Sequence, residues 1–530
     1  MFRIEYLRLG EHPQLGNIEL NLSEIEELDN LEKPYTSVII GPNGTGKSFV
    51  LRSISDILTQ FQDYSSTGKR SLNLPYQFHI RYKLDNDFYD IVTRSLIVFD
   101  RKGKRRDYIY YKNKPSELDF KENSLSEIKT GFEVPLAEVK FPERLIVSSV
   151  MLNDRFIFKN SSPNDFYQYL GTRSTNSTSS TRSSSRRTIE NIFNETQSNS
   201  AFLSNIKQLL NFLDFEESLE ITYLTKINKL FFSGNLTVEN FKKYFEEWWD
   251  PEFEFSNRSK HNPLWSIPYY NKFIKGDEDK IRSIVSFLNN LQNSERLIHK
   301  PRSRSKIIKV NFLDSTINLE ELTTIVQLEK LDIINLKGIN LIKNNTNLSI
   351  GDISSGEYHL LISMIGIFSK IRENSLILID EPEISLHPNW QMGYITFLKK
   401  VFKKCASSQF ILTSHSHFII SDLEGRSSSV TALTRNEETK KLTAELVKVN
   451  TFGWSAEEIL LKVFKVTTSR NYYVAEKLGE FLDFIAKEDI SKMEAREKFY
   501  ELRLDQLRNL SPDDPLKAAY DIIVEEYVTN

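Results

Sequence analysis

The sequence predicts an α/β fold in which one domain is split by a largely helical insertion and followed by a helical C-terminal region. Three observations predict this fold. Residues 37–58 run from an apolar, β-prone segment through a glycine-rich loop into a helical segment. Two further apolar runs, 376–380 and 410–414, end in polar residues, as strands do at the edge of a sheet. Residues 189–300 and 454–528 instead place their apolar side chains at helical spacing.

Alternation of apolar and polar residues predicts the strands of the N-terminal part. Residues 2–9 and 18–22 alternate and precede the strand at 37–40, after which 49–58 has the pattern of a helix. A strand of the buried type follows at 145–150. Between that helix and this last strand, β-branched and aromatic residues predict three more strands, at 76–83, 88–98 and 107–112.

Composition limits the class of protein. The 530 residues include 69 Lys and Arg against 72 Asp and Glu, so a formal net charge of −3 gives no overall bias toward nucleic acid. The single cysteine, Cys405, excludes a disulfide framework and a zinc site made of cysteines, which fits a reducing compartment. The N-terminus lacks signal-peptide anatomy, and no apolar run approaches the roughly 18 residues of a membrane span. We expect a cytoplasmic protein without a membrane segment.

The glycine-rich loop is a phosphate-binding motif. Residues 41–48 read Gly-Pro-Asn-Gly-Thr-Gly-Lys-Ser, which fits G-x-x-x-x-G-K-S between a strand and a helix. Lys47 is expected at the β- and γ-phosphates, and Ser48 is expected to hold Mg²⁺. A chance glycine turn is the alternative, and the flanking strand and helix argue against it. The backbone N–H groups that would surround the phosphates belong to Asn43, Gly44, Thr45 and Gly46.

Polar residues far along the chain fit the other half of such a site. Ser355 and Gly356 stand where a helical run begins, so they offer a hydroxyl and free N–H groups to an anion. Asp380 and Glu381 end an apolar strand and suit Mg²⁺ binding and activation of a water molecule. His415 ends the next strand and suits the γ-phosphate. Each feature alone has an ordinary reading as a helix cap or a polar strand end, but the ordered set makes chance a poor explanation.

This ordered set resembles the ABC-type ATPases, in the branch with the SMC/Rad50-like and OLD-like proteins. The resemblance covers residues 1–155 and 341–425 and implies an ABC-type nucleotide-binding domain that uses ATP and Mg²⁺. It also implies that the protein is an ATP hydrolase, with slow turnover. The signature loop, the Walker B acid, the catalytic glutamate and the switch histidine of that family correspond to Ser355 and Gly356, Asp380, Glu381 and His415.

Two departures from the family pattern affect the expected site. Residues 353–357 read Ile-Ser-Ser-Gly-Glu in place of Leu-Ser-Gly-Gly, a spelling frequent in the OLD-like branch. No glutamine occupies the expected Q-loop, where residues 148–154 stand. In the family the signature acts on a second subunit. The resemblance therefore implies that Ser355 of one copy faces the phosphates held by Lys47 of another, in a homodimer or a higher homo-oligomer.

The motifs divide the chain into four predicted regions. Residues 1–160 form the first ATPase lobe and 341–450 the second. The insertion between them, 161–340, lacks sustained heptads, so we expect a compact, mainly helical unit and no coiled coil. It includes a Ser/Arg-rich loop at 172–188 that cannot bury apolar surface and is expected to be mobile. Residues 451–530 are expected to form a helical, partner-binding region.

Three basic loops are candidates for contact with nucleic acid. The first carries five cations within residues 101–106, and its ordinary reading is a solvated hairpin tip. The other two loops span 173–187 and 300–306. Contact with a phosphate backbone is the alternative for all three.

The chain is not expected to carry a nuclease site of its own. No glutamate-ending strand followed by an Asp-x-Asp strand end occurs after His415, and the eight histidines form no His-Asn-His cluster. Residues 453–460, together with 142–148 and 169–173, resemble the ATP-binding subunits of bacterial antiphage defence, in the PtuA family of Septu and retron-associated systems. In that family a separate HNH nuclease, PtuB, is the partner.

Three hypotheses about function follow. The first is an antiphage ATPase that dimerises around ATP and regulates a separate HNH nuclease, with a retron reverse transcriptase and its RNA–DNA as a further partner in some systems. The second is an ATPase of the Rad50 or OLD type that binds DNA structures in repair or processing. The third is a tight ATP-binding scaffold with negligible turnover.

Overall fold

The fold was analysed in a computed structural model of the 530-residue chain. It has two compact units, Met1–Gly453 and Trp454–Asn530, each of which is described by itself. The structure describes all residues except 24–31, 69–73, 101–102, 115–131, 152–153, 159–161, 163, 172, 174–187, 190–191, 193–194, 196–200, 226–230, 248–262, 300–305, 314–318, 422, 437–438, 448–450, 452, 465–471, 487–489, 511–514 and 530.

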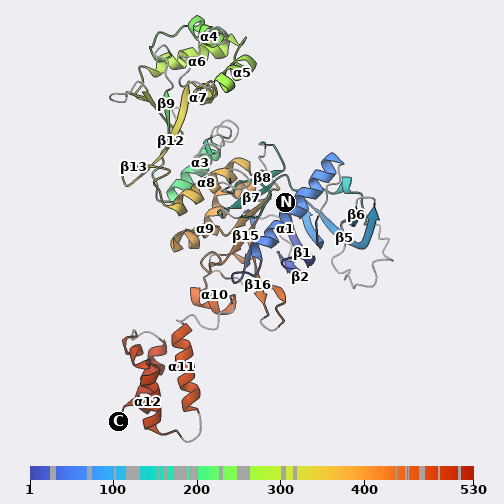
Figure 1. Ribbon diagram of the computed structural model, residues 1–530, viewed down its shortest axis with the longest axis vertical. Helices are drawn as coiled ribbons and strands as arrows, with labels where there is room; N and C mark the ends of the chain where they lie inside the picture. Colours follow the sequence, from blue (N-terminus) through green and yellow to red (C-terminus); the bar gives the residue numbers. More distant parts are fainter. Residues whose placement is uncertain are drawn as a thin grey trace. The chain divides into compact units, whose positions relative to one another are not determined.

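A seven-stranded sheet forms the centre of the first unit (Figure 1). All neighbouring strands in it are parallel except the edge strand β17, which runs antiparallel to β16. The central strands are buried along their whole length, which fits their continuous apolar runs. In spatial order the strands are β17 (Leu442–Val447), β16 (Ser428–Arg435), β3 (Tyr35–Ile40), β15 (Gln409–Ser414), β14 (Leu376–Asp380), β7 (Leu145–Ser149) and β8 (Tyr167–Tyr169).

The parallel register brings the predicted polar strand ends to one edge of this sheet. Asp380 pairs with Thr413 on one side and with Ser149 on the other, and Ser414 pairs with Ile40. Helix α1 (Lys47–Thr67) follows β3 and contacts β15, β14 and β7. Helices α8 (Ser355–Lys370) and α9 (Pro388–Val401) lie on the opposite face of the sheet from α1, and α8 contacts β7 (Figure 1). The predicted α/β fold is therefore confirmed.

A second, antiparallel sheet covers the other side of α1. Its inward side chains, such as Phe2, Ile4 and Tyr82, share one core with Ile54 and Phe61 of that helix. All five of its strands were predicted from the sequence. In spatial order they are β2 (Gly16–Asn21), β1 (Phe2–His12), β4 (Gln77–Leu84), β5 (Asp87–Asp100) and β6 (Gly103–Lys112).

The insertion contains more strand than was predicted. Its antiparallel sheet has the order β10–β11–β9–β12–β13, and one face of β9 buries Leu219, Ile221 and Tyr223. The alternation of apolar and polar residues in β9 is short. Because the segments on both sides of it have helical spacing, the sequence predicts mainly helix here. The elements are α3 (Phe202–Phe212), β9 (Leu219–Thr225), α4 (Val238–Glu247), α5 (Pro263–Phe273), α6 (Glu278–Leu291), β10 (Leu297–His299), β11 (Lys306–Asn311), α7 (Leu319–Lys330), β12 (Ile334–Lys343) and β13 (Thr346–Ser349).

The second unit is helical, as predicted. Phe481, Phe499 and Tyr520 belong to its own small core. No described helix in either unit is long and apolar enough to cross a membrane. The helices are α10 (Ala456–Lys462), α11 (Tyr472–Ile485), α12 (Lys492–Glu501) and α13 (Pro515–Ile523), and the last continues as a π-helical turn (Val524–Val528).

Candidate functional site

The glycine loop has the backbone geometry that its sequence requires. Gly44 and Gly46 adopt φ angles of 79° and 85°, in the left-handed region that favours glycine. At Gly46 a Cβ would also lie 2.3 Å from Cδ2 of Leu15, and at Gly41 it would lie 2.4 Å from the carbonyl oxygen of Leu433. The loop therefore needs glycine both for its turn and for its close packing.

Lys47 is buried at the start of α1. Its Nζ donates to the carbonyl oxygens of Gly41 (2.9 Å) and Pro42 (3.3 Å) and lies 3.1 Å from Nδ1 of His415. Burial lowers the pKa of Lys47, and the nearby charges of Glu381, Glu383 and Asp380 act in the opposite direction. Two carbonyl oxygens and a histidine thus hold the ammonium group at the glycine loop, next to the place where the phosphates are expected.

Ser48 and Asp380 meet although they lie 332 residues apart. The Ser48 hydroxyl donates to Oδ1 of Asp380 over 2.9 Å, and the Thr413 hydroxyl donates to the same oxygen over 2.6 Å. Burial raises the pKa of Asp380 to about 6. No group of three or more His, Cys, Asp or Glu side chains in the described part of the chain could hold a metal ion. Oxygen ligands from Ser48 and Asp380 suit Mg²⁺, which takes its remaining ligands from phosphate and water.

Glu381 lies beside His415 at the same edge of the sheet. Its Oε1 is 2.7 Å from Nε2 of His415, and this hydrogen bond is the main cause that lowers the pKa of Glu381. Its backbone is left-handed, with φ of 48°, and its N–H donates to the carbonyl oxygen of Thr413 over 3.2 Å. The structure therefore brings together the five side chains that the sequence singled out on separate elements: Lys47, Ser48, Asp380, Glu381 and His415.

Ser355 and Gly356 lie at the start of α8, in a different setting. The preceding residue, Ser354, caps the helix in a reciprocal pair with Glu357. A Cβ at Gly356 would lie only 2.1 Å from the carbonyl oxygen of Ser385, in the loop that follows Glu381. Within one chain, Gly356 therefore packs against the loop around Ser385. Lys47 instead forms its hydrogen bonds with the glycine loop and with His415.

Glu383 and Thr413 are site residues that the sequence reasoning did not single out. Oε1 of Glu383 accepts the backbone N–H of His415 over 2.6 Å, and burial raises the pKa of this carboxyl. Thr413 bonds to Asp380 and to the N–H of Glu381. The run Asp-Glu-Pro-Glu and the polar strand end at 413–415 were the available signals for these roles.

His12 was also missed, and it holds the neighbouring loop against the glycine loop. Its Nδ1 accepts the N–H groups of Gln14 (3.2 Å) and Leu15 (3.1 Å), and its Nε2 lies 3.2 Å from the Ser53 hydroxyl. These contacts require the neutral imidazole with its proton on Nε2. Burial lowers the pKa of His12 to about 4. Leu15, fixed in this way, is the residue that packs against Gly46.

The proposed basic loops lie largely outside the described residues. This applies to the side chains of 101–106, to 174–187 and to 300–305. Two predicted contact residues are described, and both are engaged within the chain. Arg173 forms an ion pair with Asp154 over 2.6 Å, and Lys306 donates to Gln292 and to the carbonyl oxygen of Phe232.

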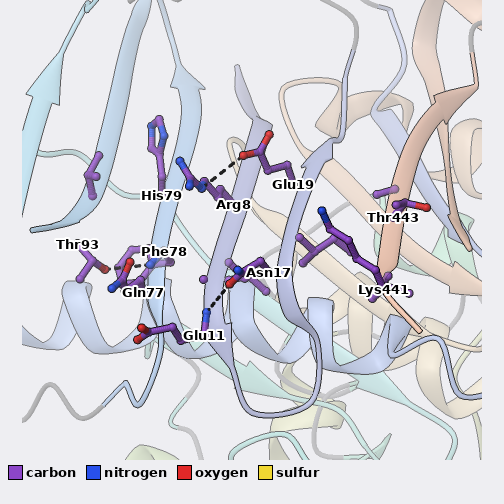
Figure 2. A pocket seen from close by; sticks show the side chains of 16 residues that line it. Arg8, Glu11, Asn17, Glu19, Gln77, Phe78, His79, Thr93, Lys441 and Thr443 are labelled. Carbon is purple, nitrogen blue, oxygen red and sulfur yellow. Dashed lines mark hydrogen bonds and ion pairs between the residues drawn. The ribbon is translucent and has the colours of Figure 1, made fainter. Parts of the chain in front are cut away.

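A cavity of about 720 Å³ lies away from the glycine loop, on the antiparallel sheet and β17. Figure 2 shows that charged side chains of both signs line it, with Arg8 paired to Glu19 and the Glu11 N–H bonded to Asn17. Lys441 and His79 also line it. Because its charges are mixed and partly paired, the cavity does not indicate one class of ligand.

Comparison with known proteins agrees with this geometry. A family model described as AAA ATPase domain matches residues 14–420, which is most of the chain. Among curated proteins, Septu protein PtuA of Bacillus thuringiensis is 30% identical over 154 residues, 29% of this chain and 36% of that protein. Retron Ec83 probable ATPase of Escherichia coli is 38% identical over 85 residues, 14% of this chain and 15% of that protein.

A third relative, Retron Vc95 probable ATPase of Vibrio cholerae serotype O1 biovar El Tor, is 30% identical over 162 residues, 27% of this chain and 29% of that protein. The chain thus spans 15% to 36% of the length of these three curated relatives. The predicted resemblance to PtuA of Septu and to retron-associated ATPases is confirmed.

Among the solved structures that match the chain are SMC heads. The Smc head domain from Pyrococcus furiosus bound to the C-terminal domain of ScpA has a TM-score of 0.33 at 13% identity, covering 92% of this chain and 100% of that one. The SMC head domain from Thermotoga maritima has a TM-score of 0.33 at 12% identity, covering 84% of this chain and 99% of that one.

Proposed function

Because the chain belongs to the AAA ATPase domain family, we propose that it binds ATP with Mg²⁺, hydrolyses it slowly and regulates a separate nuclease in antiphage defence. The observation that carries the ATPase part is the convergence of Lys47, Ser48, Asp380, Glu381 and His415 at one edge of the parallel sheet. Positioned charges of this kind supply most of the catalysis in phosphoryl transfer.

Lys47 exchanges partners when ATP binds. In the ligand-free chain its ammonium group bonds to the carbonyl oxygens of Gly41 and Pro42. The β- and γ-phosphates are stronger, charged acceptors, so the ammonium group turns to them. The N–H groups of 43–46 and the N-terminal end of α1 bind the same phosphates.

Ser48 and Asp380 are the residues that hold Mg²⁺. Their side-chain oxygens already share a hydrogen bond of 2.9 Å, so both reach one position. When bound, the ion neutralises charge on the β- and γ-phosphates. Thr413 keeps Asp380 oriented through its own hydrogen bond.

Glu381 is the base that activates the attacking water. In the ligand-free chain the hydrogen bond from His415 favours the ionised form of Glu381 and occupies its Oε1. Once that bond is released, Oε1 accepts the proton of the water that attacks the γ-phosphate. His415, which lies between Glu381 and Lys47, moves its hydrogen bond from the carboxylate to the γ-phosphate once nucleotide is present.

The ATP site is completed by a second copy of the chain. Ser355 and Gly356 open α8 with N–H groups that suit phosphate. In one chain Gly356 packs against the loop around Ser385, whereas Ser355 is exposed. In the pair, the signature of each copy faces the ATP held by Lys47 of the other. ATP therefore closes a homodimer or a higher homo-oligomer.

The nuclease belongs to a separate chain of the HNH type, and a retron reverse transcriptase with its RNA–DNA is a further partner. Support comes from the relatives, which are a Septu protein and two probable retron ATPases, and from the lack of a nuclease motif in the sequence after His415. The helical C-terminal unit is the partner-binding region in this proposal.

Affinity purification from the native host tests the proposal. An HNH nuclease should co-purify with the tagged chain, and the Lys47→Ala variant should abolish protection against phage. A chain that protects without neighbouring genes would contradict the regulatory role. Steep, salt-dependent DNA affinity that is lost on changing Arg101, Arg105 and Arg106 to Ala would instead favour the DNA-structure-binding ATPase.

A further inference from the structure

A buried ionic cluster lies next to the ATP site and takes no part in the mechanism above. Its centre is Asp154, whose side chain is fully buried. Arg173 holds both oxygens of this carboxylate, through Nη2 at 2.6 Å and Nε at 3.2 Å. The Tyr169 hydroxyl donates to Oδ2 of the same group. Such a bidentate, desolvated pair has one preferred geometry.

The cluster is closely packed around Tyr169, Gly171 and Arg173. Arg173 also donates to the carbonyl oxygen of Phe156 over 2.7 Å and lies over the ring of Tyr169. A Cβ at Gly171 would lie 2.1 Å from the Tyr169 hydroxyl oxygen, so this residue must be small for the ring to fold back. These contacts give Tyr169, Gly171 and Arg173 of the Tyr-Leu-Gly-Thr-Arg sequence a structural reason, and Leu170 has a contact of its own with α8.

One side of the cluster reaches the nucleotide-binding residues. The charge of Asp154 adds to the burial that raises the pKa of Asp380. The next residue, Arg155, places its guanidinium 5.2 Å from the ring centre of Phe49, in the first turn of α1. Asp154 and Arg155 follow β7, whose last residue, Ser149, pairs with Asp380.

The other side of the cluster reaches the helix that carries Ser355 and Gly356. Leu170 packs on α8 so closely that a Cβ at Gly366 would lie 3.1 Å from its Cδ1. The backbone N–H of Leu170 donates to the carbonyl oxygen of Val147 in β7 over 2.8 Å. Leu170 is thus fixed both to the strand beside Asp380 and to the signature helix.

We propose that Asp154, Tyr169 and Arg173 are positioning residues that couple ATP at Lys47 and Asp380 to the placement of α8, and hence to pairing with a second copy. This inference rests on the proposed function. With the cluster intact, α8 is held in fixed register with the strand that borders the ATP site. Without the cluster, a single chain still binds nucleotide, but α8 no longer holds Ser355 and Gly356 in one position for the second copy.

The test measures two equilibria in the full-length Glu381→Gln chain, which retains ATP. Binding of a fluorescent ATP analogue reports the single-chain site, and mass photometry with ATP reports pairing. Arg173→Gln should leave nucleotide affinity within about twofold but weaken pairing by roughly 5- to 150-fold, the usual range of coupling between sites. Arg173→Lys keeps the positive charge but lacks the planar guanidinium that binds both carboxylate oxygens. Its pairing should therefore be weaker than that of the parent chain and stronger than that of Arg173→Gln.

Arg296→Gln is the matched control, because Arg296 forms a half-exposed pair with Glu321 in the insertion, and it should leave both equilibria unchanged. If Arg173→Gln does not fold, Tyr169→Phe removes a single hydroxyl and should give a smaller loss of pairing in the same direction. Unchanged pairing in a folded variant, or equal losses of nucleotide affinity and pairing, would overturn the coupling role. Absence of ATP-driven pairing in the parent Glu381→Gln chain would instead refute the proposed function.

Discussion

The backbone N–H of His415 donates to Oε1 of Glu383 over 2.6 Å, at the end of β15. This contact fixes the backbone from which the imidazole reaches Glu381 and Lys47. The Glu383 carboxylate thus holds the backbone of His415, while the Glu381 carboxylate accepts the ring N–H. The two glutamates have separate tasks although only one residue lies between them.

Replacing Glu383 should change turnover more than nucleotide binding. Glu383→Ala leaves the His415 N–H without its charged acceptor, a loss of about 1.5–3 kcal/mol that corresponds to roughly 10- to 150-fold in kcat. Glu383→Gln retains an acceptor oxygen and should keep most of the activity. Steady-state phosphate release separates kcat from KM in both variants. An equal loss in the Gln and Ala variants would show that the charge, and not the position of His415, is what matters.

Glu381→Gln should retain ATP but stop hydrolysis. The amide keeps the shape of the side chain and cannot accept the proton of the attacking water, so turnover should fall by about 10²- to 10⁴-fold. Single-turnover hydrolysis together with filter binding of labelled ATP measures both properties. A turnover equal to that of the parent chain would remove Glu381 from the mechanism.

Gly356→Ala should disturb the start of α8. The added Cβ would lie 2.1 Å from the carbonyl oxygen of Ser385, so the helix or the loop must move, at a cost of about 2 kcal/mol. Gly351→Ala is the matched control, because the nearest atom to its Cβ is 3.9 Å away. Thermal unfolding and ATP-driven pairing should both suffer in the first variant only. Equal unfolding midpoints for the two variants would refute the close packing.

Acid should destabilise the chain through His12. Its pKa is about 4 in the folded chain and near 6.5 when unfolded, so its stabilising contribution is present above pH 6.5 and is lost as the pH falls toward 4. The loss amounts to about 3 kcal/mol, since the two pKa values differ by about 2.5 and each whole pKa unit corresponds to about 1.4 kcal/mol. His12→Asn offers an acceptor to the same N–H groups but does not titrate. Urea unfolding at several pH values should show a shallower acid loss in this variant, and identical slopes would contradict the assignment.

Four strands of the central sheet, β3, β7, β14 and β15, could be predicted because they are continuous apolar runs. Strands β8, β16 and β17, which complete the sheet, were not predicted from the sequence. The insertion was harder. β9 and β12 pair across more than one hundred residues of sequence, and their short alternating patterns show nothing of that partnership. Helical spacing on both sides then dominated the prediction.

Much of the candidate site could also be predicted, because Lys47, Ser48, Asp380, Glu381 and His415 each stand at the end of a recognisable strand or loop. Glu383, Thr413 and His12 could not. Their contacts are to backbone N–H groups or to residues of other elements, and such contacts leave no spacing in the sequence. Arg173 was placed in a basic loop because its partner, Asp154, is 19 residues away and adjacent only in the fold.

Mixing two inactive variants tests the two-chain ATP site most directly. A pair formed by one Lys47→Ala chain and one Ser355→Arg chain has both lesions in one site and none in the other. Random pairing of equal amounts should therefore restore about a quarter of the parental hydrolysis, since half of the pairs are mixed and each has one intact site. If the mixture stays as inactive as either variant alone, Ser355 does not act on the ATP bound by another copy.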